Sequence, residues 1–335
     1  MKSKVLVIGG GIVGLVSALK LLEKDFEVSI LDAQKPGAAS NMAGGILFPL
    51  KPWEISIEML RLCTDGINEY NIFFSNLDSK EKSQIQQYKR DTIILGNMLE
   101  KANIWYSKNT ITDFKFYKEN LNQYKEVFNE NFSEFLLLKD INIVDPGLLK
   151  KYIESNLKSK GVNFISGNVD NVDNLFEKSK NKELSSYDYI VVTAGAWSSS
   201  LFNLDIKIKP IKGQLLFFRS NNPLIENVVI IDDYYMIPRS KNILVVGSTL
   251  EDVGFDISTS KIARDNLSEQ VYKVFNKELN LRCIDQVSGF RPFSDINEPY
   301  ICKHPGNSKI IFNFGHFRYG ILTAFSSANK LINLI

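Results

Sequence analysis

Three glycines near the N-terminus have the spacing of a phosphate-binding turn. Gly9, Gly11 and Gly14 form a Gly-x-Gly-x-x-Gly pattern directly after a short apolar run. Gly9 permits a tight turn, Gly11 lets the backbone approach a pyrophosphate, and Gly14 allows a helix to pack closely against a strand. The free N–H groups at the start of that helix would favour an anion. The spacing therefore predicts a dinucleotide site.

A carboxylate follows where a nucleotide ribose would lie. A strand is predicted at residues 4–8, a helix at 12–24 and a second strand at 27–31, which Asp32 ends. A carboxylate in this place can accept hydrogen bonds from a ribose diol and would repel a 2′-phosphate, which disfavours NADP. These residues alone leave NAD and FAD open, and also an ordinary turn without a ligand.

Further segments continue the predicted nucleotide-binding domain. Residues 37–54 are rich in small side chains, as a chain that passes close to a bulky ligand must be, and 55–77 reads as a helix. The apolar run at 187–198 predicts a buried strand that ends in Thr-Ala-Gly-Ala. Small residues at the carboxyl end of such a strand leave room for a ligand.

A helix with well-defined ends lies between these segments. Asp145 is a suitable N-cap, Pro146 suits the first helical position, and Gly161 is a suitable stop. A strand is expected next, at residues 162–166. A strand, a helix and a strand in this order predict a parallel α/β sheet.

The middle of the chain has a different character. Residues 213–219, 228–238 and 243–248 read as strands joined by short polar turns. This pattern is typical of an antiparallel sheet. We therefore expect an α/β fold in which a Rossmann-type nucleotide-binding domain carries an inserted antiparallel-sheet domain.

Composition limits the range of functions. The 335 residues include 40 Lys and Arg against 38 Asp and Glu, a formal net charge of +2 that argues against nucleic acid as a partner. No run is long enough to cross a membrane and no cationic leader precedes the first strand, so we expect a cytoplasmic protein. Cys63, Cys283 and Cys302 are widely spaced and lack metal-ligand spacing, which predicts buried free thiols and no metal site.

The order of motifs along the whole chain resembles the D-amino acid oxidase superfamily, and within it the glycine oxidases of the thiamine pathway. The motifs that follow the first glycine turn are "AGGILFPLKPW", "VDPGLL", "VVTAGAWS", "PIKGQLL", "YMIPR", "VVGSTLEDVGFD", "SGFRPFSDINEPYICKHP" and "FNFGHFRYGILTA". The last two are the most specific, whereas the glycine turn alone would fit many families.

This resemblance implies a glutathione-reductase-like FAD domain and a separate substrate domain. The implied boundaries place residues 1–83, 137–208 and 287–335 in the FAD-binding domain and residues 84–136 and 209–286 in the substrate domain. The residues expected to contact FAD are Gly9, Gly11, Ile12, Val13, Gly14, Asp32, Ala43, Gly44, Gly45, Ile46, Leu47, Val169, Thr193, Ala194, Gly195, Trp197, Gly213, Arg291, His316, Phe317, Arg318, Tyr319, Gly320 and Ile321.

The implied reaction is oxidation of a small amino acid such as glycine to its imine, with hydride transfer to flavin N5 and reoxidation by O₂ to hydrogen peroxide. In the thiamine pathway this imine is used to build a thiazole ring. Such chemistry requires orientation of the substrate carboxylate, for which the planar double donor of an arginine is suited.

Four side chains are candidates for this site. Arg291 is the candidate carboxylate anchor, although composition alone would favour a surface arginine. Arg318 is the second candidate and would lie beside the flavin and the amine. The alternative is that Arg318 forms a structural ion pair. Tyr235 could donate a phenol hydrogen bond, although an aromatic residue in a strand often belongs to the core. His316 is expected to support the flavin loop and not to act as a base.

Several departures from related glycine oxidases leave the amine preference open. Tyr319 stands where Asn is common, and Ile46 and Leu250 stand where some relatives have Met. Covalent flavin is not expected, because Cys302 comes later than the flavin-linked cysteine of sarcosine oxidases and lies in a segment that reads as a strand.

Other functions stay open at this stage. They are a D-amino acid dehydrogenase, an FAD oxidoreductase that acts on a modified tRNA base, a non-catalytic flavoprotein and an NAD-dependent dehydrogenase. The near-neutral charge counts against the tRNA substrate, and the late "GHFRYG" segment counts against NAD. The expected partners are a small amino acid and O₂, without nucleic acid or membrane, and a homo-oligomer is left open.

Overall fold

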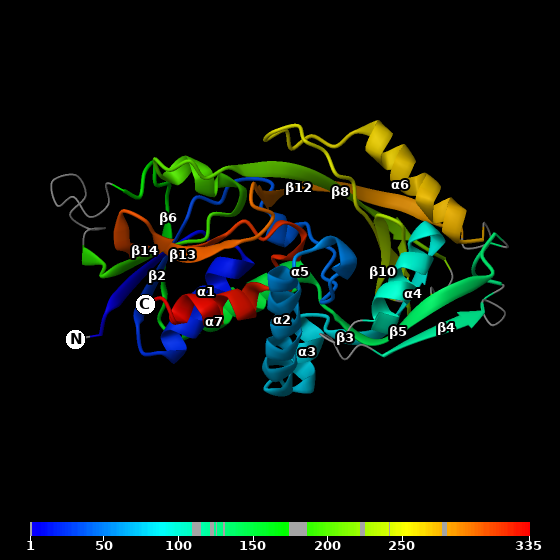
Figure 1. Cartoon of the computed structure of the whole chain (residues 1–335), viewed down its shortest axis with the longest axis horizontal. Coiled ribbons are helices and arrows are strands. Elements are labelled where there is room, and N and C mark those ends of the chain that lie inside the picture. The colour runs from blue at the N-terminus through cyan, green and yellow to red at the C-terminus, as the bar shows by residue number, and fades with distance from the viewer. Residues whose placement is uncertain are drawn as a thin grey trace.

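Two β-sheets, each covered by helices, form the body of the chain in the computed structural model (Figure 1). The structure describes residues 2–108, 115–120, 124, 126–129, 131–173, 186–221, 225–240, 242–276 and 280–335. The first sheet lies on the left of Figure 1 and the second on the right.

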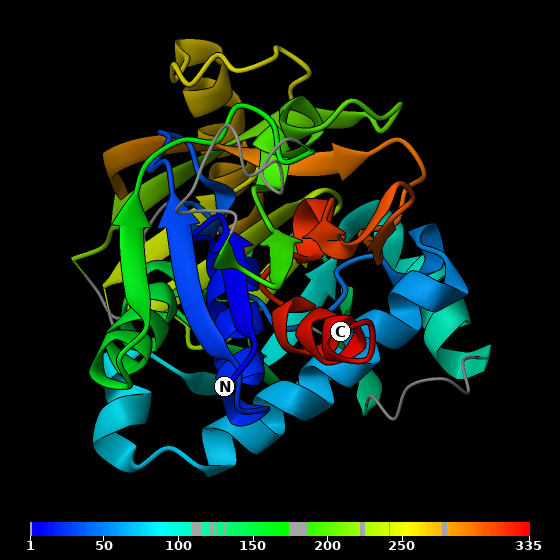
Figure 2. The same ribbon diagram turned by 90° about the vertical axis from the view of Figure 1, so that its left-hand side faces the viewer.

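The first sheet is parallel except at one edge. Its order is β13-β14-β7-β1-β2-β6, and only β13 runs antiparallel to its neighbour. Figure 2 shows the blue strands of the N-terminal unit beside green β6. The strand bounds are β1 Lys4–Ile8, β2 Glu27–Asp32, β6 Asn163–Ser166, β7 Tyr189–Val192, β13 Tyr300–His304 and β14 Asn307–Phe314.

Alternating apolar side chains bury both faces of this sheet. Val5 and Val7 of β1 pack in the core beneath the helices, whereas Leu6 and Ile8 face a second core on the opposite side. The helices are α1 Ile12–Glu23, α2 Ile57–Ser75, α3 Ser79–Gln84, α5 Pro146–Ser159 and α7 Ala324–Ile332. The side chain of Asp145 accepts a hydrogen bond from the Leu148 N–H at 2.9 Å, which confirms the predicted cap of α5.

The second sheet is antiparallel except for the β3–β9 pair, and its order is β12-β8-β11-β10-β9-β3-β5-β4. Helix α6 covers one face and α4 the other. The strands are β3 Tyr88–Leu95, β4 Phe116–Asn120, β5 Glu134–Ile143, β8 Ile208–Arg219, β9 Val228–Ile231, β10 Tyr234–Ser240, β11 Ile243–Gly247 and β12 Arg282–Ser294. The helices are α4 Leu99–Lys108 and α6 Lys261–Val274, and the described part of the chain also has the short 3₁₀ helices η1 Ala39–Asn41, η2 Pro52–Glu54, η3 Gly96–Met98, η6 Gly195–Leu201 and η8 Phe317–Tyr319.

The predicted single strand at residues 228–238 is wrong. The chain turns at Asp232 and Asp233 and forms the hairpin of β9 and β10. Asp232 has a φ of 51°, the left-handed conformation that a two-residue hairpin turn requires and that Asp tolerates. The apolar residues on both sides of the two aspartates concealed this turn in the sequence.

The prediction of buried cysteines holds for Cys63 only. All three cysteines are free, but Cys283 is half-buried and Cys302 is exposed. Cys302 lies on β13, which is an edge strand of the first sheet among the residues that the structure describes. Its predicted place in a strand is confirmed.

The expected fold class is confirmed: a parallel nucleotide-binding sheet is combined with a mostly antiparallel second sheet. The predicted boundaries at residues 137 and 287 fall within β5 and β12, two strands of the second sheet. The division of the chain into domains remains a prediction.

Candidate cofactor and substrate site

A cavity of about 530 Å³ lies at the carboxyl ends of the first sheet's parallel strands and extends to the second sheet. Ile8 and Asp32 line it from β1 and β2, and Arg291 lines it from β12. Its volume is in the range of cofactor and ligand sites. The parallel sheet therefore provides one end of the cavity and the antiparallel sheet the other.

At the first end, helix α1 points its N-terminus into the cavity. Gly11 is the N-cap and provides no side-chain cap, and the first turn of α1, all of it described, carries no acidic residue. The Ile12 N–H donates to Ser40 Oγ at 3.0 Å. A Cβ built on Gly11 would meet only this hydroxyl, at 3.4 Å, so the space beyond belongs to the cavity. Such a helix terminus is suited to bind the pyrophosphate of a dinucleotide.

Gly9 and Gly14, the other two glycines of the motif, pack closely against backbone atoms. A Cβ on Gly14 would lie 1.9 Å from the Gly9 carbonyl oxygen, and one on Gly9, whose φ is 112°, would lie 2.6 Å from the Thr193 carbonyl oxygen. The Thr193 hydroxyl is within 3.0 Å of the carbonyl oxygens of both Ile8 and Gly9. These contacts require glycine for helix–strand packing at Gly14, as its spacing predicts.

Asp32 lines the same end of the cavity, as expected of a ribose-binding carboxylate. Its Oδ1 accepts a hydrogen bond from the Gln34 N–H at 3.3 Å. A Cβ on Gly10 would lie 2.7 Å from Asp32 Oδ2, so Gly10 leaves room for this side chain. The turn, the helix terminus and the carboxylate together fit a dinucleotide cofactor.

The segment at residues 43–46 passes from the first end of the cavity towards the second and is held by a buried arginine. The Arg239 guanidinium donates hydrogen bonds to the carbonyl oxygens of Gly44 and Val144. Burial lowers the pKa of Arg239, and the Asp145 carboxylate, 3.9 Å from its Nε, opposes this shift. The arginine of "YMIPR" therefore positions backbone at the cavity wall.

His316 lies in the loop that precedes α7 and lines the cavity. Its ring nitrogens lie 2.9 Å from the Thr323 hydroxyl and 3.0 Å from Asn313 Oδ1. Burial lowers the pKa of His316 to about 3, so the imidazole is neutral at physiological pH. These fixed contacts are those of a residue that supports the loop.

At the second end, the Arg291 guanidinium lies flat against the neighbouring strand β8. A Cβ on Gly213 would lie 2.2 Å from both of its terminal nitrogens, so only glycine leaves room there. One terminal nitrogen donates to the Thr249 carbonyl oxygen at 3.1 Å and the other to Ser248 Oγ at 2.7 Å. Burial lowers the pKa of Arg291, the nearby Tyr235 phenol opposes this and the charge of Arg318 reinforces it.

Tyr235 occupies the strand position next to a second glycine. It pairs with Gly247 across β10 and β11, and Cβ atoms on Gly44 and Gly247 would lie 2.8 Å and 2.9 Å from its ring. Tyr235 lines the cavity near Arg291. Glycines on adjacent segments thus make the space that both side chains fill.

Arg318 lines the cavity as well and is half-buried. Its guanidinium carbon lies 5.5 Å from the centroid of the Phe317 ring. The cavity therefore receives two guanidinium groups, from β12 and from the loop before α7, and their like charges favour an anionic ligand between them.

Most of the residues predicted for the site line this one cavity, and two do not. Gly14 and Leu47 are outside the lining: Gly14 packs against Gly9, and the buried Leu47 belongs to the core beneath the parallel sheet. Of the positions that depart from related sequences, Ile46 and Tyr319 line the cavity and Leu250 does not.

The predicted residues in the lining are Gly9, Gly11, Ile12, Val13, Asp32, Ala43, Gly44, Gly45, Ile46, Val169, Thr193, Ala194, Gly195, Trp197, Gly213, Tyr235, Arg291, His316, Phe317, Arg318, Tyr319, Gly320 and Ile321. Sequence reasoning missed Gly10, Ser40 and Ser248, which also line it. Gly10 could have been found from the Gly-Gly-Gly run, whereas the contacts of the two serines depend on distant segments.

In the described ranges of the chain, no group of three or more His, Cys, Asp or Glu side chains could hold a metal ion. No helix in those ranges is both long and apolar enough to cross a bilayer.

The family model described as FAD dependent oxidoreductase, DAO, matches residues 4–334. The chain belongs to this family. A glycine oxidase of Pseudomonas putida is 26% identical to it, over 100% of this chain and 95% of the relative. The structure of glycine oxidase from Geobacillus kaustophilus has a TM-score of 0.83 at 20% identity and covers 99% of this chain and 95% of that one.

A more distant structure, L-α-glycerophosphate oxidase of Mycoplasma pneumoniae with FAD bound, has a TM-score of 0.81 at 16% identity, over 100% of this chain and 94% of that one. As a DAO-family enzyme the chain is an FAD-dependent oxidoreductase, and its cofactor is FAD. The glycine turn, the free end of α1 and Asp32 suit the ADP half of FAD.

Proposed function

We propose that this DAO-family enzyme oxidises glycine or a similarly small amine to its imine and passes the electrons to O₂, which becomes hydrogen peroxide. The observation that carries the proposal is the Arg291 guanidinium, which lies against the glycine backbone of β8 and lines the cavity beside Tyr235. Glycine oxidases among the relatives of the chain support the choice of glycine.

Arg291 is suited to bind the substrate carboxylate with two hydrogen bonds. Each terminal nitrogen of a guanidinium carries two hydrogens, and the two contacts to Ser248 and Thr249 use one on each. The second hydrogen of each nitrogen can then reach a carboxylate in the planar, bidentate geometry that arginine favours. Tyr235 would add a phenol hydrogen bond.

Arg318 is assigned to the other end of the substrate. A positive charge beside the substrate nitrogen disfavours its ammonium form and favours the neutral amine, which is the form that gives up a hydride. His316 is not assigned the role of base, because its lowered pKa makes it a weak base and its two ring nitrogens have partners. Substrate orientation therefore carries most of the protein's contribution.

FAD, when bound, supplies the hydride acceptor and the route to O₂. The backbone at residues 43–46 and the loop at residues 315–320 would hold its flavin half, since both line the cavity near Arg291. The imine would be used in thiazole synthesis for thiamine or hydrolyse to glyoxylate and ammonia. A cytoplasmic location and a homo-oligomer remain predictions from the sequence.

The experiment is anaerobic flavin reduction by glycine, sarcosine, D-alanine and a modified tRNA, followed by peroxide measurement in air. Glycine should reduce the flavin rapidly and yield peroxide. Rapid reduction by D-alanine or the tRNA without reduction by glycine would overturn the glycine assignment. Reduction by glycine without peroxide would instead indicate a dehydrogenase.

A further inference from the structure

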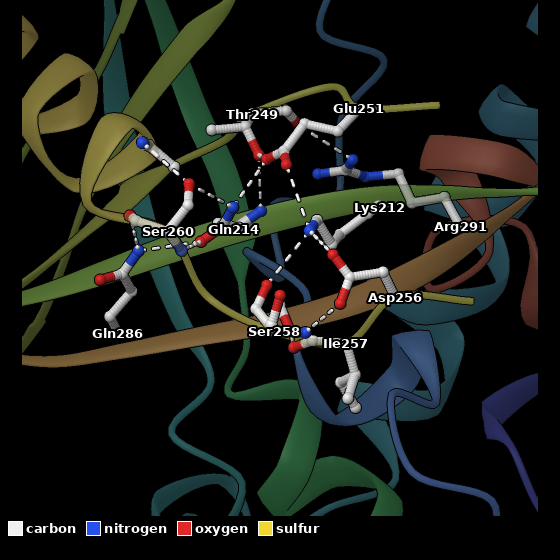
Figure 3. Close-up of polar contacts among 12 residues, drawn as sticks. Lys212, Gln214, Thr249, Glu251, Asp256, Ile257, Ser258, Ser260, Gln286 and Arg291 are labelled. Carbon is white, nitrogen blue, oxygen red and sulfur yellow. Dashed lines mark hydrogen bonds and ion pairs between the residues drawn. The ribbon is translucent and has the colours of Figure 1, made fainter. Parts of the chain in front are cut away.

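A buried lysine joins β8 to the segment that follows β11. The Lys212 side chain is only 3% exposed, and its Nζ lies 3.3 Å from Glu251 Oε2, 3.0 Å from Asp256 Oδ2 and 3.1 Å from the Ser258 carbonyl oxygen. Figure 3 shows these side chains in one polar group. Burial alone would lower the pKa of Lys212, but the two carboxylates raise it above its ordinary value, so the ammonium stays charged.

Glu251 is the centre of this group. Besides Lys212, its carboxylate accepts hydrogen bonds from Thr249 Oγ1 at 2.5 Å and from Gln214 Nε2 at 2.8 Å. Burial would raise the pKa of Glu251, but these three donors lower it below its ordinary value. The backbones of Lys212 and Glu251 also exchange hydrogen bonds of 2.9 Å and 3.0 Å, so the segment lies beside β8 as a short added strand.

The same segment holds the candidate substrate arginine. Ser248 and Thr249 each accept a hydrogen bond from Arg291, and the hydroxyl of Thr249 binds Glu251. The negative charge of Glu251 acts on Arg291, which Figure 3 draws next to the group. The carboxylate of the group whose charge acts on this guanidinium is thus engaged by Lys212, Gln214 and Thr249, while Arg291 donates to neutral oxygens.

We propose that Lys212 is a positioning residue for Arg291: by binding Glu251, it prevents this carboxylate from competing with the substrate carboxylate for the guanidinium. The inference rests on the proposed role of Arg291 as the substrate anchor. Without the ammonium group, Glu251 would turn towards Arg291, a cation on which its charge already acts, because a partly buried carboxylate is costly without a positively charged partner.

The test measures flavin reduction by glycine in FAD-loaded Lys212→Met, Glu251→Gln and the double variant. Lys212→Met should raise the half-saturating glycine concentration about tenfold, with a change of about twofold or less in the limiting rate. The double variant, which has no competing carboxylate, should return to within about threefold of wild type. Binding of acetate, followed by the flavin absorbance change, should show the same pattern without turnover.

If Lys212 had only a structural role, the double variant would be as impaired as Lys212→Met, because removal of both partners would be as harmful as removal of the lysine alone. A double variant no better than Lys212→Met overturns the proposal, and so does an unchanged half-saturation in Lys212→Met. Lys212→Arg should restore most of the affinity, since it keeps a charge for Glu251. If Lys212→Met does not fold, Lys212→Gln, which keeps a donor for the Ser258 carbonyl, replaces it with the same expectations.

Lys209→Met is the matched control. Lys209 also lies on β8 and reaches the same segment through Asp252, but both partners are exposed and the pair does not involve Glu251. Its loss should leave glycine binding unchanged. Arg291→Ala distinguishes the proposed anchor role of Arg291 from the proposed positioning role of Lys212. Normal glycine affinity in Arg291→Ala would refute the anchor itself. Weak glycine affinity in Arg291→Ala together with normal affinity in Lys212→Met would refute only the role of Lys212.

Discussion

The two ends of the cavity are formed by different kinds of group, backbone at one end and side chains at the other. The nucleotide end consists mainly of backbone, with glycines that lack side chains, the N-terminus of α1 and carbonyl groups that pack against the turn, and adds the Asp32 carboxylate. The substrate end consists of long side chains: Arg291 and Tyr235, which glycines of adjacent segments accommodate, and Arg318. A backbone-built site depends on a few local residues, whereas a side-chain-built site depends on the pairing of distant strands.

This difference predicts how each end responds to substitution. An added side chain at the nucleotide end blocks a cofactor or breaks the fold, because the backbone has no alternative arrangement. Truncation at the substrate end should weaken substrate binding and leave the fold and the cofactor in place. The predictions below test this contrast.

The largest effect is expected at the glycine turn. Gly11→Val should give a folded protein with little FAD, because its side chain would enter the cavity and not the core. Gly14→Ala should lose both FAD and folding stability, because its Cβ would lie 1.9 Å from a backbone oxygen. Visible absorbance reports FAD and thermal unfolding reports stability. Stoichiometric FAD in Gly11→Val would contradict a pyrophosphate site at this turn.

Arg291→Ala should have the next largest effect. Loss of a charge-assisted pair of about 1.5–3 kcal/mol should raise the half-saturating glycine concentration roughly tenfold to a hundredfold and slow reduction, because Cα is no longer held against the flavin. Stopped-flow flavin reduction measures both quantities. Arg291→Lys should recover only part of the loss, since the ammonium keeps the positive charge but lacks the planar pair of donors of the guanidinium.

FAD content in the Arg291 variants should equal that of wild type, since the residue is proposed to bind the substrate. Gly213→Ala is an independent route to the same defect, because the added methyl would displace the guanidinium from β8. Wild-type kinetics in Arg291→Ala, with a loss confined to Arg318→Ala, would move the anchor to Arg318.

The buried His316 should make the holoenzyme sensitive to acid. Its pKa is lowered by burial to about 3, against an ordinary value of about 6.5, so the unfolded chain binds more protons between these values and stability falls as the pH drops. Between pH 7 and pH 5 this contribution is about 2 kcal/mol. Urea unfolding at both pH values measures it, and His316→Gln should have a smaller difference. An equal difference in both proteins would refute this assignment.

Tyr235→Phe should have the smallest effect. The ring would still fill the space between Gly44 and Gly247, and only one hydroxyl would be lost. A net hydrogen bond of about 0.5–1.5 kcal/mol corresponds to a rise of roughly twofold to tenfold in half-saturating glycine. The same reduction assay measures this change, and an effect as large as that of Arg291→Ala would mean that Tyr235 has a further role.

The contrast between the two ends also explains what the sequence could predict. The unit from β1 to Asp32 follows from local patterns, because its apolar periodicity, its glycines and its terminal carboxylate are neighbours in the chain. The cap of α5 at Asp145 is local in the same way. Such features need no knowledge of strand pairing.

The features that the sequence could not predict depend on the pairing of strands that lie far apart in the chain. The fit of Arg291 over Gly213 and of Tyr235 beside Gly247 depends on the order β12-β8-β11-β10, which no local pattern specifies. The sequence predicts Gly213 as a cofactor residue and does not predict that it lies against Arg291. The exposure of Cys302 likewise follows from the place of β13 at a sheet edge.

The long pairing of β8 with β12 has a consequence for the evolution of the enzyme. Arg291 is opposite Ile211, and Gly213 is opposite Gly289 two residues away, within one continuous register from Asp285 to Ser294. Deletion of a single residue from β8 between Gly213 and Arg219 would shift this register and turn every side chain from the deletion to the end of the strand to the opposite face of the sheet. Homologues should therefore keep the lengths of these two strands and the glycine and arginine at positions 213 and 291, while gaps and insertions gather in the segments outside the strands.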